Sequence, residues 1–256
     1  MKASIVVANY NNAKFVPDCI NSINSQTYKN YEIIFFDDNS NDNSIEVVEK
    51  FKNVKIIKNK DQSKFGSLNQ INAFTKAIEI STGEIIFLLD SDDFFHEKKI
   101  EKIIEVFEKE KNKMIIFDFP TIINKNKTSL IKKKSIFKTY WGFIHPTSCI
   151  SIRKNFTNTL LKSISKKQFT DIWVDLRILI YSKYMLNDYF TINENLTYYR
   201  QTENNISSKF NKFSKNWWLR RCQAHDYFLD FAKDNNLRIK KNLDYLVTKT
   251  ICYFIK

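Results

Sequence analysis

Residues 84–93 read EIIFLLDSDD, an apolar run of strand length that ends in three carboxylates within four residues. The run is typical of a buried strand, in which side chains on both faces are covered. Three carboxylates placed directly at the end of such a strand are costly without a compensating cation. The stretch therefore predicts a buried strand with an acidic site at its carboxyl end.

Short apolar runs and longer amphipathic runs alternate around this stretch through the first half of the chain. The predicted strands cover residues 4–8, 32–36, 54–58, 84–89 and 114–117. The predicted helices cover residues 15–26, 44–51, 68–80 and 97–111. Such an order predicts an α/β fold with a mostly parallel sheet flanked by helices, which binds ligands beyond the carboxyl ends of its strands.

The alternation weakens after Pro120, where we predict a boundary. The lysine-rich residues 124–134 predict a loop, residues 141–153 a further strand, 171–184 a helix and 198–208 a loop. The last fifty or so residues predict a helical tail, with Phe210, Phe213 and Trp217 on one helix face.

The composition indicates a globular protein with a basic surface. The chain has 256 residues, 43% of them hydrophobic, and a net charge of +13. Such a charge attracts polyanions, including nucleic acid, anionic lipid and phosphorylated substrates, and does not choose among them. The four cysteines form no C-x-x-C pair, and no run approaches the roughly 20 apolar residues that span a bilayer. A cytoplasmic protein is expected, and any membrane contact would be peripheral.

The acidic cluster Asp90, Asp92 and Asp93 has two interpretations. Carboxylates from alternating positions suit Mg²⁺ or Mn²⁺, which bridge phosphate oxygens. Alternatively the cluster is a turn in which Asp93 caps the helix that begins near Glu97.

A second acidic edge, Asp37-Asp38-Asn39-Ser40, follows the strand at residues 32–36. One of its carboxylates could accept hydrogen bonds from a base or ribose. The alternative is an Asx turn and a helix cap at Asn43 or Ser44. Together the two clusters favour a ligand site, because both strand ends would face one crevice.

Four segments together resemble the family-two glycosyltransferases with the GT-A fold. They are SIVVANYNN at residues 4–12, SINSQTY at 22–28, DDNS at 37–40 and GEIIFLLDSDD at 83–93. The resemblance covers about residues 3–205 and is strongest in the first half. It implies an inverting, metal-dependent transferase of the bacterial surface-glycan type, with a Rossmann-like sheet.

The resemblance also implies a donor side. Tyr10 would pack on the nucleotide base, Asp38 would accept a hydrogen bond from it, Asp90 would lie near the ribose, and Asp92 would hold the metal. The residues implied on the donor side are Ala8, Tyr10, Asp38, Lys64, Asp90, Ser91 and Arg200. Relatives carry an Arg-Asn pair where this chain has Phe74-Thr75, so a donor contact is either missing or supplied elsewhere, with Lys64 as the nearest candidate. Relatives commonly have an Arg-x-His loop here, and this chain has Thr202 in place of the histidine. Arg200 remains as a phosphate ligand.

On the acceptor side the resemblance implies a catalytic base, Asp171, in the segment TDIWVDLR at residues 170–177. Relatives usually have Glu-Asp there, and the alternative is that Thr170 caps a helix and Asp171 is a first-turn acid. The residues implied at the acceptor are His145, Thr147, Ser148 and Trp173. For His145 a structural role is the alternative.

The expected function is transfer of a sugar from a nucleotide diphosphate sugar, with a UDP-sugar favoured, to a hydroxyl of a surface glycan or lipid-linked saccharide. Residues 1–120 would bind the nucleotide sugar, residues 121–205 the acceptor, and residues 206–256 would form the tail. Mn²⁺ or Mg²⁺ would be the cofactor. The alternative is a basic nucleic-acid-binding protein or a non-catalytic glycan- or nucleotide-binding protein. Nucleic acid is not expected as a partner, since acidic clusters at two strand ends repel phosphates unless a metal intervenes.

The tail segment KFNKFSKNWWLRR, at residues 209–221, mixes cations with aromatic side chains. It could lie on the anionic inner face of the cell membrane. The alternative is that its aromatic rings pack the tail onto the rest of the protein.

Overall fold

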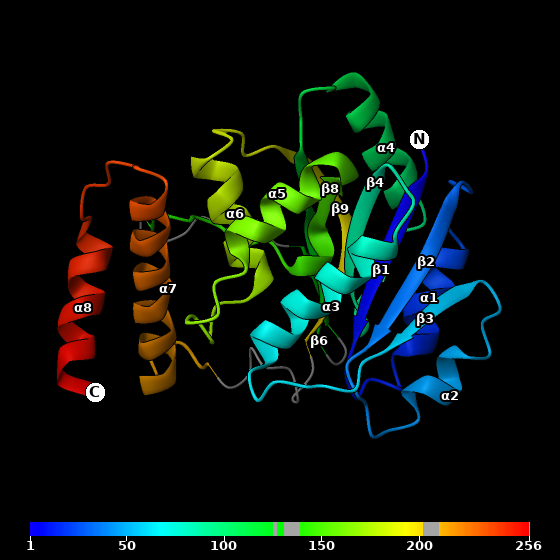
Figure 1. The fold of residues 1–256 in the computed structure, drawn as a ribbon, viewed down its shortest axis with the longest axis horizontal. Coiled ribbons are helices and arrows are strands. Elements are labelled where there is room, and N and C mark those ends of the chain that lie inside the picture. The colour runs from blue at the N-terminus through cyan, green and yellow to red at the C-terminus, as the bar shows by residue number, and fades with distance from the viewer. Residues whose placement is uncertain (125–126, 131–138, 202–209, 256) are drawn as a thin grey trace.

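One mixed β-sheet lies between two layers of helices, and a helical hairpin follows at the C-terminus (Figure 1). A computed structural model describes residues 1–124, 127–130, 139–201 and 210–255. The sheet has the order β3-β2-β1-β4-β8-β6-β9-β5, and β7 pairs with β6. Strands β3, β2, β1 and β4 are parallel, whereas β8 is antiparallel to both of its neighbours, β4 and β6.

The strands and helices have the following bounds. The strands are β1 (Ala3–Asn9), β2 (Tyr31–Asp37), β3 (Val54–Lys58), β4 (Ile85–Asp90), β5 (Phe94–Phe95), β6 (Ile115–Asn124), β7 (Lys127–Leu130), β8 (Ile150–Arg153) and β9 (Thr191–Gln201). The helices are α1 (Val16–Asn24), α2 (Ser44–Val48), α3 (Gly66–Ile80), α4 (Lys99–Lys109), α5 (Lys154–Ile164), α6 (Val174–Tyr184), α7 (Lys215–Asp234) and α8 (Leu243–Ile255), with a 3-10 turn η1 (Thr147–Cys149).

The two faces of the sheet build two separate hydrophobic cores because successive side chains of a strand point to opposite faces. In β1, Val6 belongs to the core under α3, α5, α6 and α7. Its neighbours Ile5 and Val7 belong to the core under α1 and α4. Strands covered on both faces need continuous apolar runs, which explains the sequences of β1, β2 and β4.

The structure confirms the predicted α/β fold, its first four strands and four helices, and a helical C-terminal region. Two predicted loops are wrong in part. Residues 127–130 form strand β7, and residues 198–201 belong to strand β9. The remainder of both loops, including Thr202, lies outside the described residues.

The tail begins later than the aromatic pattern suggests. Helix α7 begins at Lys215, and Phe213 precedes it with a positive φ of 70°, so Phe213 and Trp217 do not share a helix face. The division at residue 120 stays a prediction, and β6 runs through that residue. None of the helices in the described ranges is long and apolar enough to cross a lipid bilayer.

Candidate active site

Strand β1 joins the two acidic strand ends. The amide of Asp38, after β2, donates to the carbonyl of Asn9 at 2.8 Å, and the amide of Ser91, after β4, donates to the carbonyl of Ala8 at 3.0 Å. The parallel register of β2 and β4 on either side of β1 requires this arrangement. Two segments more than fifty residues apart in the chain therefore meet at one edge of the sheet, as the sequence predicts.

The two acidic residues after β2 have different roles. Asp37 makes the turn, since its carboxylate accepts from the Ser40 amide at 2.9 Å and from the Ser40 hydroxyl at 2.6 Å. The Asp38 carboxylate accepts from Asn59 Nδ2 at 2.8 Å and from Gln62 Nε2 at 3.0 Å. A carboxylate has about four acceptor positions, so these amides orient Asp38 and leave capacity for a ligand.

The carboxylates after β4 concentrate negative charge. Asp93 is fully buried, and burial followed by repulsion from Asp92 and Asp90 raises its pKa well above the usual value. Burial and the neighbouring Asp92 raise the pKa of Asp90 to about 7. Such crowding of like charges is relieved by protonation or by a cation.

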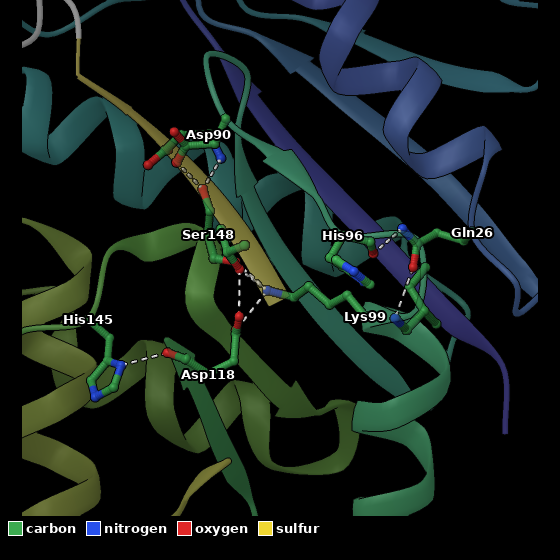
Figure 2. A network of polar contacts seen from close by, with 10 residues as sticks. Gln26, Asp90, His96, Lys99, Asp118, His145 and Ser148 are labelled. Atoms are coloured by element: carbon green, nitrogen blue, oxygen red, sulfur yellow. Dashed lines mark hydrogen bonds and ion pairs between the residues drawn. The ribbon is translucent and has the colours of Figure 1, made fainter. Parts of the chain in front are cut away.

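Ser148 holds this acidic loop in place (Figure 2). Its hydroxyl donates to Asp93 Oδ2 at 2.6 Å and accepts from the Asp90 amide at 3.0 Å. Ser148 lies in η1, one of the segments that the resemblance places at the acceptor. In the structure it is fully buried and bonded to the acidic loop, so it acts as a support for that loop.

A buried ammonium group in turn holds Ser148. Lys99 Nζ, on α4, donates to the Ser148 carbonyl at 2.6 Å, to Asp118 Oδ1 at 2.8 Å and to Thr197 Oγ1 at 2.6 Å (Figure 2). The ammonium also lies 4.3 Å from the ring centroid of Phe95. Three acceptors satisfy its three N–H groups, which makes a charge at this depth tolerable.

Arg200, on β9, also contacts the acidic loop. Its amide donates to Asp93 Oδ1 at 2.9 Å, and its guanidinium donates to the Asp92 carbonyl at 3.0 Å and to Asp18 Oδ2 at 2.9 Å. The guanidinium also packs over the rings of Phe15 and Phe94. The structure thus brings this sequence-predicted residue to the acidic cluster.

Gln70, on α3, links the donor and acceptor sides, although its sequence context does not single it out. Its Nε2 donates to Asp90 Oδ1 at 2.9 Å and to Thr147 Oγ1 at 3.3 Å, while its Oε1 accepts from the Val174 amide at 3.4 Å. In the sequence it is one polar residue of an amphipathic helix. Only its spatial neighbours reveal its role.

Asp171 is exposed and lies just before the start of α6, between the buried residues Phe169 and Ile172. The Asp171 amide donates to Gln223 Oε1 at 2.6 Å, and its Oδ2 accepts from Gln223 Nε2 at 3.4 Å. The hydroxyl of Ser67, on α3, donates to the Thr170 carbonyl at 2.5 Å. Thr170 makes no side-chain cap here; Trp173 precedes the first turn of α6.

Asp175 is a second carboxylate in this region, and the sequence pattern alone does not mark it as a site residue. Burial raises its pKa, and the positive charge of Arg220 opposes that rise. Asp175 also contributes to the raised pKa of Asp90. It therefore lies within electrostatic reach of the acidic loop.

His145 is 1% exposed and sits among aromatic rings, including Phe117 and Phe143. Its Nδ1 donates to the Asp118 carbonyl at 2.7 Å, and its Nε2 accepts from the Tyr189 hydroxyl at 2.5 Å. Burial lowers its pKa to about 4. Both ring nitrogens contact protein oxygens, which fits the structural alternative considered for this residue.

Three further donor-side positions differ in surroundings. Tyr10 follows β1 and is 48% exposed, so its ring is open to a ligand. Lys64 is exposed before α3 and lies over the ring of Phe65. Phe74, where the resemblance implies an arginine, is 1% exposed and packs in the core.

The acidic loop after β4 offers a divalent ion one or two carboxylates. Within the described ranges no three His, Cys, Asp or Glu side chains converge into a complete metal cage. Mg²⁺ and Mn²⁺ sites that bridge substrate phosphates need only one or two protein carboxylates. The excess negative charge of Asp90, Asp92 and Asp93 fits such a cation.

The chain belongs to glycosyl transferase family 2, whose sequence profile, described as "Glycosyl transferase family 2", matches residues 4–168. An uncharacterized glycosyltransferase of Nostoc sp. is 30% identical over 218 residues, which are 78% of this chain and 65% of that protein. The Escherichia coli enzyme WfaP, a UDP-Glc:α-D-GlcNAc-diphosphoundecaprenol β-1,3-glucosyltransferase, is 38% identical over 108 residues, 42% of each chain. This chain thus spans less than two thirds of the length of these relatives.

Solved structures show the same fold. Staphylococcus aureus TarS (residues 1–349) in complex with UDP-GlcNAc has a TM-score of 0.65 at 16% identity, covering all of this chain and 71% of that one. The mannosyltransferase PcManGT of Pyrobaculum calidifontis, in complex with GDP-Man and Mn²⁺, has a TM-score of 0.58 at 13% identity, covering 98% of this chain and 69% of that one.

Proposed function

We propose that this protein transfers a sugar from a nucleoside diphosphate sugar, with a UDP-sugar favoured, to a hydroxyl of a bacterial surface glycan or lipid-linked saccharide. The observation that carries the proposal is the meeting of two acidic strand ends on β1, at Asp38 and at Asp90. WfaP uses UDP-Glc and a diphosphoundecaprenol acceptor, and TarS binds UDP-GlcNAc, which supports this substrate class.

The donor would lie across the ends of β1, β2 and β4. Tyr10 offers an exposed ring for the base, and Asp38, oriented by Asn59 and Gln62, offers a carboxylate for its N–H groups. Ala8 and Ser91, which are joined by a main-chain hydrogen bond, would lie beneath the donor. Arg200 would bind a phosphate oxygen, because guanidinium suits phosphate, and it would exchange part of its contact with Asp18 to do so.

Asp92, with Asp90 beside it, would hold a divalent ion. Bound there, the ion would neutralise charge on the leaving diphosphate. In this loop the Asp93 carboxylate is already fixed by Ser148 and by the Arg200 amide, and the Asp90 carboxylate by Gln70, so little reorganisation is needed on binding.

Asp171 would be the general base that takes the acceptor proton. Attack by the hydroxyl on the face opposite the diphosphate gives inversion at the anomeric carbon. Thr147 and Trp173 lie on the elements that flank this side, near Gln70. Asp175 is the alternative carboxylate for this role, since it is electrostatically coupled to Asp90.

The experiment is a transfer assay with a panel of nucleotide sugars and saccharide acceptors, each with Mn²⁺, Mg²⁺ or EDTA. We expect metal-dependent release of the nucleoside diphosphate with one donor, and its loss in Asp92→Asn. Thermal stabilisation by UDP and Mn²⁺ supplies an independent readout of donor binding. Binding of no nucleotide in the presence of either metal would refute the proposal.

A further inference from the structure

Helix α8 turns its apolar side to solvent and its polar side to the protein. Its exposed apolar side chains are Leu243 (76%), Leu246 (51%), Val247 (40%), Tyr253 (81%) and Phe254 (78%). Their spacings of three, four and seven residues place them on one side of the helix, here called the α8 face. Asp244 and Thr248, on the opposite side, are 8% and 0% exposed.

Specific contacts with α7 fix this orientation. Asp244 is ion-paired with Arg221, and its Oδ2 lies 3.1 Å from His225 Nε2. Cys252 Sγ donates to the Trp218 carbonyl at 3.3 Å. Rotating α8 to bury its apolar stripe would separate these groups, so the α8 face stays exposed.

The charges that α8 and the segment before it expose are positive, and beside them Asp226 of α7, 45% exposed, pairs with Lys249 of α8. Arg238, Lys240 and Lys241 are exposed just before the helix. Asp244 is the one acidic residue between positions 238 and 255, and it is buried. An exposed apolar stripe whose own segment exposes cations and no acid matches an anionic lipid surface. Two copies paired through this face would bring their cations into the same interface, which disfavours self-association.

Exposed aromatic rings gather near the carboxyl end of α8. The contact between Cys252 and Trp218 places this end beside the start of α7. There Phe213 is 54% exposed, and its ring centroid lies 5.4 Å from that of Trp217. Aromatic rings with neighbouring cations are typical of side chains at the boundary between water and lipid.

We propose that the α8 face, with Phe213 and the cations that precede the helix, docks on an anionic lipid bilayer. The carboxyl end of α8 contacts α7 at Trp218, and α7 also carries Gln223, which bonds Asp171. Docking would therefore place the candidate acceptor side near the lipid head groups. The proposal concerns a surface, and it holds or fails independently of the transfer reaction.

The test is cosedimentation of the full chain with vesicles of phosphatidylcholine mixed with phosphatidylglycerol, and with vesicles of phosphatidylcholine alone. We expect binding to the anionic vesicles that Leu246→Glu with Phe254→Glu weakens about ten-fold or more, because both side chains leave the lipid. Ile80→Glu is the matched control, since Ile80 on α3 is 47% exposed and outside this surface. Replacing Lys240 and Lys241 by Gln should weaken binding about five-fold for each cation removed.

Circular dichroism verifies that each variant is folded. Equal binding of the double variant and the wild-type protein would overturn the proposal, as would equal binding to neutral and anionic vesicles. A wild-type protein that stays in the supernatant but is a dimer dissociated by Leu246→Glu would show instead that the α8 face joins two copies.

Discussion

Lys99 and Asp118 form an ion pair with a distance of 2.8 Å between Nζ and Oδ1, and neither side chain is exposed to solvent. Desolvation alone would cost a charged pair at this depth more than it gains. The additional bonds from Lys99 to Ser148 and Thr197 compensate for that cost. Through Ser148 the pair also supports the loop that carries Asp90 and Asp93.

Lys99→Met should lower the free energy of unfolding by about 3–5 kcal/mol, because Asp118 would remain buried without its cation. Lys102→Met is the matched control on the same helix. Lys102 pairs with Glu194 at the surface, with side-chain exposures of 35% and 43%, so we expect a loss below about 1 kcal/mol. Denaturant unfolding measures both, and equal losses would contradict a special role for Lys99.

Ser148→Ala should lower both stability and donor binding. The hydroxyl serves the Asp90 amide and Asp93 Oδ2, and leaving these groups without it costs about 1–3 kcal/mol. Ser151→Ala is the control, because the Ser151 hydroxyl is also buried but finds no partner among the residues that the structure describes. Unfolding curves compare the stability of the two variants, and titration with UDP and Mn²⁺ compares their donor binding. Weaker UDP binding in the Ser151 variant alone would refute this prediction.

Asp171→Asn should reduce kcat by about 10²–10⁴ without weakening donor binding, as expected for loss of a general base. Asp175→Asn, measured side by side, should leave kcat within a small factor. The substitution keeps the size of each side chain and removes its basicity. If the Asp175 variant loses activity and the Asp171 variant retains it, Asp175 is the base.

Arg177 binds four main-chain carbonyls of the segment before α6, at Ile164, Lys166, Phe169 and Ile172. Arg177→Met should therefore lower the free energy of unfolding by about 3–5 kcal/mol, because buried carbonyls lose a charged donor. Arg238→Met, at an exposed position, should change it by less than about 0.5 kcal/mol. Chemical denaturation followed by tryptophan fluorescence provides the comparison.

His145 should make stability depend on pH. Its pKa falls from 6.5 to about 4 in the folded protein, so the unfolded chain binds a proton in this range and the folded chain does not. Its contribution is complete above pH 6.5 and is lost as the pH falls towards 4, by up to about 3 kcal/mol. His145→Phe lacks this proton, so its free energy of unfolding should decline less over the same interval. Parallel curves of unfolding free energy against pH for the two proteins would show that folding does not lower the pKa of His145.

The strands that end in carboxylates could be predicted because their signals are local. An apolar run fixes a buried strand, and the residues after it must lie at its end. For this reason the amino-acid sequence alone suffices to assign Asp38, Asp90 and Asp92 to one edge of the sheet.

The supporting residues could not be predicted, because their partners are distant in the chain. Lys99 lies within an amphipathic helix, and its burial depends on Thr197, 98 residues away. Gln70 depends in the same way on Val174, 104 residues away. Strand β9 ends in the polar residues Arg200 and Gln201. Polar residues at this point predict a loop, and only their pairing with β6 shows that they belong to a strand.

Because consecutive carbonyls of β1, those of Ala8 and Asn9, hold the loops after β4 and β2, the spacing between the two loops is set by one peptide unit. Neither loop can shift along the sheet without breaking its bond to this strand. Changes of donor preference during evolution should therefore arise by exchange of side chains such as Tyr10 or Gln62 on an unchanging backbone, and insertions should be tolerated only farther along each loop.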